Sequence, residues 1–191
     1  LDLLRTEVPQ YMKYEVLNEV QQTLYVDRHS KESGLTTSTT LTAIPLKRYV
    51  DTRNYVVAQS ILREDPPSDE SLLDGNSVAE RLVVYEKLLH RKGYLDYSGI
   101  LKEAVEELTS DDGLRKRLAA RIKHVIVDEY QDVNPIQEAI VWSLQNLGAK
   151  LCVVGDDDQT IYQWRGSDVQ NILTFDTRYP DVKQRRLEDN F

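Results

Sequence analysis

The sequence predicts an α/β fold built on a parallel sheet, and two apolar runs with a helical segment between them carry this prediction. Residues 125–127 form a short β-branched run that stops at two acids, Asp128 and Glu129. Residues 151–154 form a second apolar run, which ends in a glycine and three acids. Runs of this length and composition are typical of strands buried on both faces of a parallel sheet. We therefore expect a strand–helix–strand unit over residues 124–154 that crosses over right-handed.

The helix of this unit has sequence signals at both of its ends. Asn134 is a favoured N-cap residue, Pro135 suits the first helical position, and Gln137 stands at the third. Gly148 is a typical residue just past the end of a helix. The apolar stripe expected on this helix consists of Ile136, Ile140, Leu144 and Leu147.

The part of the chain before this unit is predicted to be mainly helical. A short helical pattern breaks at Pro9, and the proline pair 66–67 precedes a polar linker. Ser77 can cap a helix that ends near Gly93. Helices are expected over residues 14–30, 46–63, 77–92, 101–108 and 114–122. Gly34 is the expected stop signal after the first of them. Residues 36–42 are expected to be extended or loop.

After the second strand the patterns are weaker. Ser167 and Gln170 can form a capping box that opens a short helix. Residues 182–187 are a plausible third strand, although their polar residues indicate partial exposure.

Acidic side chains follow both predicted strands. Burying a carboxylate is costly, so Asp128, Glu129 and residues 156–158 should lie where the strands emerge from the sheet. Open α/β sheets bind their ligands at this carboxyl edge. Carboxylate oxygens are ligands that Mg²⁺ prefers, so a site for phosphate and metal is possible there. An acidic surface loop after the first strand explains Asp128 and Glu129 equally well.

The segments VDEYQDVN (127–134) and VVGDDDQTIYQWRGS (153–167) resemble motifs II and III of the UvrD/Rep-type superfamily 1 DNA helicases, and the terminal LEDNF resembles the start of motif IV. The resemblance covers roughly the last third of the chain. It implies part of a RecA-like P-loop NTPase sheet that lacks the phosphate-loop strand, together with a mostly helical inserted subdomain. The implied boundaries are 1–13 for the end of a first RecA-like segment, 14–92 for the insert and 93–191 for the segment with the motifs.

The resemblance also implies roles for individual residues, with ATP and Mg²⁺ as cofactors. Asp128 would hold Mg²⁺, and Glu129 would orient and deprotonate the attacking water, because phosphoryl transfer needs charge neutralisation and an in-line nucleophile. Gln159 matches the residue that senses the γ-phosphate. Gln131 and Asp132 match the motif too, but bonding within the turn is as good an explanation as a functional role.

Tyr162, Trp164 and Arg165 match the part of motif III that contacts single-stranded DNA. An aromatic ring beside a guanidinium is suited to stacking on bases and pairing with phosphate. An isolated tryptophan more often packs in a core, so Trp164 has a structural alternative. The acids at 156–158 are better explained as turn residues than as a second metal site.

Composition excludes several other classes of protein. The chain has 191 residues, enough for one or two domains, and 40% hydrophobic residues, as in a folded globular protein. No apolar run approaches the roughly 20 residues that span a bilayer, and no signal peptide is visible. The one cysteine, Cys152, is expected to be a small core residue and suits a cytoplasmic protein. The net charge of −8 argues against a general electrostatic grip on DNA.

The functional hypothesis is an ATP-dependent DNA helicase that moves 3′ to 5′ on single-stranded DNA, unwinds duplex DNA and acts in a process such as DNA repair. No G-x-x-x-x-G-K-[ST] motif occurs in these 191 residues, so the chain alone is expected to lack ATPase activity. The alternatives are a non-catalytic DNA- or protein-binding domain and a subunit of a helicase–nuclease. A metal-dependent hydrolase is a weaker alternative, because no histidine lies near the acids at 156–158.

Overall fold

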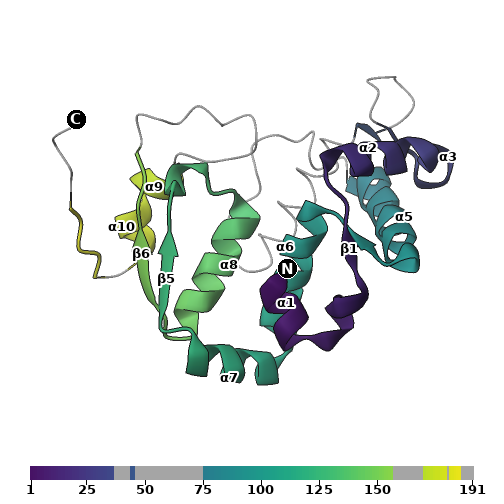
Figure 1. Ribbon diagram of the computed structural model, residues 1–191. Helices are drawn as coiled ribbons and strands as arrows, with labels where there is room; N and C mark the ends of the chain where they lie inside the picture. The colour runs from purple at the N-terminus through teal and green to yellow at the C-terminus, as the bar shows by residue number, and fades with distance from the viewer. Residues whose placement is uncertain (37–43, 46–74, 157–169, 180, 186–191) are drawn as a thin grey trace.

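The computed structural model describes residues 1–36, 44–45, 75–156, 170–179 and 181–185, in which helices alternate with short strands (Figure 1). The elements are α1 (Asp2–Glu7), η1 (Pro9–Lys13), β1 (Glu15–Val16), α2 (Glu19–Arg28), α3 (Ser30–Ser33), β2 (Leu35–Thr36), β3 (Ile44–Pro45), α5 (Gly75–Lys92), β4 (Tyr94–Leu95), α6 (Tyr97–Ser110), α7 (Asp112–Arg121), β5 (His124–Val127), η3 (Tyr130–Asp132), α8 (Pro135–Asn146), β6 (Lys150–Val153), α9 (Gln170–Leu173) and α10 (Phe175–Arg178). Among these elements, no helix is long and apolar enough to cross a membrane.

Strands β5 and β6 pair in parallel, which confirms the predicted strand–helix–strand unit. Val125 lies opposite Leu151, and Val127 lies opposite Val153. The pairing continues past the strand ends, where the Val154 amide donates to the Val127 carbonyl over 2.8 Å. Both strands therefore end side by side at the same edge (Figure 1).

Helix α8 begins and continues as its sequence predicts. The Asn134 side chain accepts a hydrogen bond from the Gln137 amide, and the Gln137 side chain accepts one from the Asn134 amide, each over 3.0 Å. These two bonds satisfy backbone donors that a helix start leaves free. α8 packs between the sheet and α6, in a core cluster formed by Leu101, Val105, Ile136, Ala139 and Ile140.

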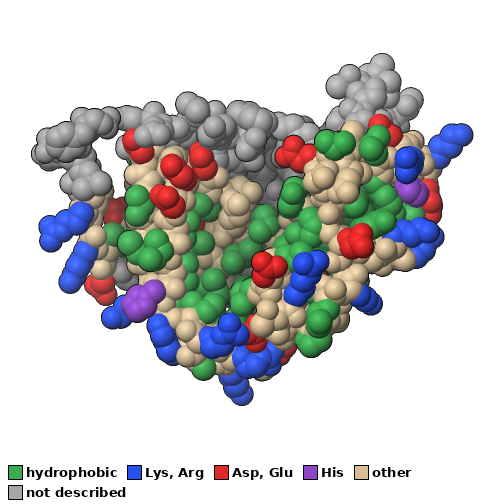
Figure 2. All heavy atoms as spheres, viewed as in Figure 1, with side chains coloured by type: hydrophobic (Ala, Val, Ile, Leu, Met, Phe, Trp, Pro, Cys, Tyr) green, Lys and Arg blue, Asp and Glu red, His purple; other side chains and the backbone are tan. Residues whose placement is uncertain are grey.

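One face of the β5–β6 sheet is exposed, so the prediction of strands buried on both faces is wrong for the described residues. Ile126 is 75% exposed and Val154 is 51% exposed. Cys152, expected in the core, is also exposed. The reason is that α8 covers the other face, which leaves alternate residues of both strands at the surface. Figure 2 shows hydrophobic side chains at the surface over these strands.

The helix expected over residues 14–30 starts later, because its first residues form a strand. β1 pairs in parallel with β4, which places Glu15 opposite Tyr94 and Val16 opposite Leu95. Asn18 then caps α2 through a capping box with Gln21. The local pattern did not show this strand, since its partner lies far along the chain.

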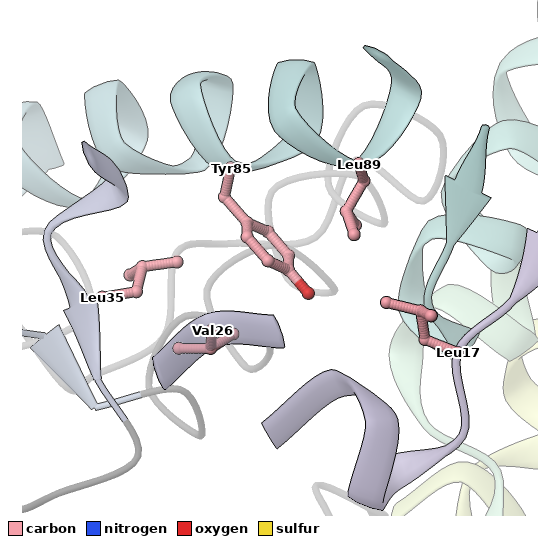
Figure 3. Packing of buried hydrophobic residues seen from close by; sticks show 5 residues of the cluster. All are labelled: Leu17, Val26, Leu35, Tyr85 and Leu89. Carbon is pink, nitrogen blue, oxygen red and sulfur yellow. The ribbon is translucent and has the colours of Figure 1, made fainter. Parts of the chain in front are cut away.

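The helical part of the fold has its own hydrophobic core, which Figure 3 shows between α5 and the segments opposite it. Two apolar residues of α2, Val20 and Leu24, are exposed and lie outside this core. The core cluster contains Leu17, Val26, Leu35, Tyr85 and Leu89.

The ends of the neighbouring helices agree with the sequence in two places and differ in one. Gly34 and Gly93 have φ angles of 68° and 73°, a region that glycine adopts without steric cost, and each lies just past a helix as predicted. Helix α5, however, begins at Gly75 among the described residues, so Ser77 lies inside the helix and not at the position before it.

Asp96 has a structural role at the start of α6. It is buried, and its side chain caps α6 by accepting from the Gly99 amide over 2.6 Å. The same carboxylate accepts from the Gln22 side chain over 2.8 Å. Asp96 therefore ties α2 to the start of α6.

The predicted third strand is not formed where the structure describes it. Residues 182–185 have no strand pairing. Their polar side chains do not offer the apolar face that would hold them on a sheet. The helix expected at 46–63, residues 37–42 of the extended segment and the capping residue Ser167 lie outside the described residues.

Candidate functional site

Acidic side chains lie together at the carboxyl ends of β5 and β6, as the sequence predicts. Asp128 and Glu129 follow β5 directly, and Asp156 follows β6 after Val154 and Gly155. Figure 2 shows acidic side chains gathered above this end of the two strands. Carboxyl edges of parallel strands are where α/β proteins place ligands, so this edge is the candidate site.

The turn after β5 holds its two acids in different ways. Glu129 has a φ angle of 50°, in the left-handed region that residues other than glycine rarely adopt. The Asp128 carboxylate accepts a hydrogen bond from the Glu129 amide over 3.0 Å. Both side chains are exposed. Strained backbone of this kind persists where the surrounding structure holds it, often at functional sites.

Gln131 connects this turn to the end of β6. Its side chain is 1% exposed. Nε2 donates to Glu129 Oε2 over 2.6 Å, and Oε1 accepts from the Asp156 amide over 3.0 Å. The sequence left open whether Gln131 was structural or functional, and its contacts join two acids of the candidate site.

Glu138, on α8, is a buried carboxylate that the sequence did not indicate. It accepts hydrogen bonds from the hydroxyl groups of Tyr130 and Tyr179, the latter over 2.8 Å. Arg178 also donates to it over 2.8 Å. Burial raises the pKa of Tyr130 and of Tyr179 well above the usual value, and the Glu138 carboxylate adds to the effect.

Aromatic contacts strengthen the same connection between α10 and the turn after β5. Phe175 stacks on Tyr179 with ring centroids 4.6 Å apart, and it forms a T-shaped pair with Tyr130, with ring centroids 5.3 Å apart. No local signal could have shown this cluster, because Arg178 and Tyr179 lie about 40 residues from Glu138 along the chain. The cluster holds Tyr130, the residue between Glu129 and Gln131.

The other predicted site residues, Gln159, Tyr162, Trp164 and Arg165, lie outside the described residues. The structure therefore brings together Asp128, Glu129 and the neighbouring Gln131 and Asp156. Within the described part of the chain, no three His, Cys, Asp or Glu side chains are grouped so as to hold a metal by themselves.

Comparison with known proteins agrees with these motifs. Residues 12–180 match the family model of the UvrD/REP helicase N-terminal domain. A curated relative named ATP-dependent DNA helicase PcrA, from Staphylococcus epidermidis, is 35% identical over 128 residues, which are 67% of this chain and 18% of the relative. A protein of the same name from Staphylococcus aureus is 36% identical over 107 residues, 56% of this chain and 15% of the relative. The chain thus spans less than a fifth of the length of these relatives. It belongs to the UvrD/Rep-type superfamily 1 helicases.

Proposed function

We propose that the protein containing this chain is an ATP-dependent DNA helicase, which couples ATP hydrolysis to 3′-to-5′ movement on single-stranded DNA and to duplex unwinding. Family membership and the names of the PcrA relatives support this proposal. The observation that carries it is the placement of Asp128 and Glu129, exposed and adjacent, at the shared carboxyl edge of two parallel strands.

The proposed architecture is part of a RecA-like P-loop NTPase domain with a helical insert at residues 14–92. The parallel β5–β6 pair, with α8 as its crossover helix, supports the first part. The β1–β4 pair supports the second, because it places residues 15–16 beside residues 94–95. An inserted subdomain must begin and end at neighbouring positions of the domain that contains it, and these two strands are such neighbours.

The residues at the strand ends fit Mg²⁺ bound together with a nucleotide. Mg²⁺ usually binds proteins through one or two carboxylates and fills its other positions with water and phosphate oxygens. The exposed Asp128 offers such an oxygen, and a dedicated cage of protein ligands is not required. When bound, Mg²⁺ neutralises charge on the phosphates. Asp128 would hold it directly or through water.

Glu129 is the proposed general base. Its exposed carboxylate can reach a water molecule, and only Oε2 receives the hydrogen bond from Gln131, so Oε1 can accept the proton. By family resemblance, Gln159 would contact the γ-phosphate, and Tyr162, Trp164 and Arg165 would contact single-stranded DNA.

The test uses the full-length protein with Glu129→Gln. The amide keeps the shape of the side chain but cannot take the proton. ATP binding should therefore remain while DNA-stimulated turnover falls by about 10²–10⁴-fold. Glu106→Gln changes an exposed carboxylate on α6 in the same way and should leave turnover unchanged. Normal turnover in Glu129→Gln would remove Glu129 from this role.

Direction of movement needs its own measurement. Duplexes with a 3′ or a 5′ single-stranded overhang are offered to the full-length protein with ATP, and strand displacement is followed. We expect strand displacement for the duplex with a 3′ overhang and none for the duplex with a 5′ overhang. Binding of DNA without ATP-driven displacement would favour the non-catalytic alternative.

A further inference from the structure

The side chain of Gln131 makes two hydrogen bonds in opposite directions, and their chemistry fixes the orientation of its amide. The backbone N–H of Asp156 can only donate, so the Gln131 atom that it meets must be the oxygen. The nitrogen therefore faces Glu129, whose ionised carboxylate can only accept. A carboxylate or a hydrocarbon at position 131 could not satisfy both partners.

The protein around Gln131 leaves its amide little freedom. The side chain is buried, and the Tyr130 amide beside it donates to the Val154 carbonyl over 2.9 Å. A Cβ atom at Gly155 would lie 2.6 Å from Gln131 Oε1, closer than real Cβ atoms approach. The absence of a side chain at Gly155 is thus what lets the amide reach the backbone after β6.

The hydrogen bond from Gln131 Nε2 to Glu129 is charge-assisted, because its acceptor is an ionised carboxylate, and such hydrogen bonds are shorter and stronger than neutral ones. Glu129 stands on strained backbone and its side chain is exposed, so few other contacts restrict its rotamers. Among the described residues, Gln131 is the side chain that holds this carboxylate. A general base must be oriented towards the proton that it removes, and loss of that orientation costs rate.

We propose that Gln131 is a positioning residue, which orients the Glu129 carboxylate to take a proton from the water that attacks the nucleotide and ties it to the backbone after β6 at Asp156. This inference rests on the proposed function, in which Glu129 is the base. Asp156 begins the acidic turn that leads to Gln159 in the sequence. The bridge therefore links the base to the segment expected to sense the γ-phosphate.

The test compares Gln131→Glu with Gln131→Met in the full-length protein. Gln131→Glu keeps an oxygen for the Asp156 amide but replaces the donor to Glu129 by a like charge. Gln131→Met keeps the length of the side chain and removes both bonds without adding a charge, so it serves if Gln131→Glu does not fold. Loss of an orienting partner typically lowers activity by about 10–100-fold. We expect a fall of this size in kcat for both variants, with the KM for ATP nearly unchanged.

The same substitution is then made in the Glu129→Gln background, which separates positioning from a general structural role. If Gln131 acts through Glu129, adding Gln131→Glu should change turnover by less than about 2-fold there. A fall as large as in the wild-type background would overturn the inference, as would normal kcat in folded Gln131→Glu. If Glu129→Gln alone keeps normal turnover, the proposed role of Glu129 is wrong. This outcome depends on the Glu129 variant only, so it is distinguished from a failure of the inference on Gln131.

Discussion

Glu129 and Glu138 lie close together in the chain and on either side of the same turn, yet their surroundings are opposite. Glu129 is exposed, stands on strained backbone and receives one side-chain hydrogen bond from the residues that the structure describes, namely from Gln131. Glu138 is 1% exposed and receives three, from Tyr130, Arg178 and Tyr179. A carboxylate with both oxygens hydrogen-bonded can hold a fold together, whereas one with an oxygen open to solvent can take a proton. The difference separates a structural acid on α8 from a candidate catalytic acid in the turn before it.

The largest expected effect on stability comes from removing the buried acid. Glu138→Ala removes the carboxylate that pairs with Arg178 and accepts from two tyrosine hydroxyls, and breaking a buried charge pair in this way costs about 3–5 kcal/mol of unfolding free energy. Glu129→Ala removes an exposed side chain and the one hydrogen bond from Gln131, and should cost less, about 1 kcal/mol. Urea unfolding followed by circular dichroism measures both. Similar losses for the two variants would contradict the distinction between them.

Tyr179→Phe reduces the Glu138 cluster by one donor and should have a smaller effect. The ring can keep its stacking on Phe175, while one hydrogen bond to a charged group is lost, at about 1.5–3 kcal/mol. The control is Tyr97→Phe, because Tyr97 is an exposed tyrosine on α6. An equal loss in the control would show that the hydroxyl contact with Glu138 contributes nothing.

The same variant has a predicted pH dependence. Burial raises the pKa of Tyr179 in the folded protein, whereas in the unfolded chain it is about 10. Below pH 10 both states hold the proton, so the stability from this group is fully present. As pH rises above 10 the unfolded chain loses its proton first, and the unfolding free energy falls by about 1.4 kcal/mol per pH unit for each such group. Tyr179→Phe should therefore show a shallower fall between about pH 10.5 and 12.

Gly155→Ala tests the surroundings of Glu129, because the new side chain would crowd Gln131. The new methyl group would meet Gln131 Oε1 at 2.6 Å and Ile172 Cδ1 at 2.7 Å. Such crowding typically costs about 1–3 kcal/mol. Turnover in the full-length protein should also fall, because Gln131 must move away from Glu129 or Asp156. Unchanged stability together with unchanged turnover would show that the turn accommodates a side chain there.

Sequence alone predicted the parts of this fold that depend on neighbouring residues. Asn134, Pro135 and Gln137 marked the start of α8, because a helix cap is made by residues within one turn of each other. The apolar run before Asp128 marked β5 in the same way, and the carboxyl edge of the sheet followed from it.

The parts that sequence did not predict depend on residues far apart in the chain. The strand at Glu15–Val16 forms because residues 94–95 lie beside it, and the periodicity of residues 14–30 cannot show that. In the sequence, Glu138 looks like an ordinary polar residue of a helix, and only the fold shows that Arg178 and Tyr179 bind it. The roles of Gln159, Tyr162, Trp164 and Arg165 stay predictions.

The exposed face of the β5–β6 sheet carries a thiol whose reactivity can report whether other polypeptide packs on that face. Cys152 is the one cysteine of the chain, and it lies on β6 among alternate residues that are open to solvent. A maleimide dye would therefore label a single known position without an engineered cysteine. Any further polypeptide that packs on this face would shield the thiol, so the labelling rate measures how far the sheet is covered.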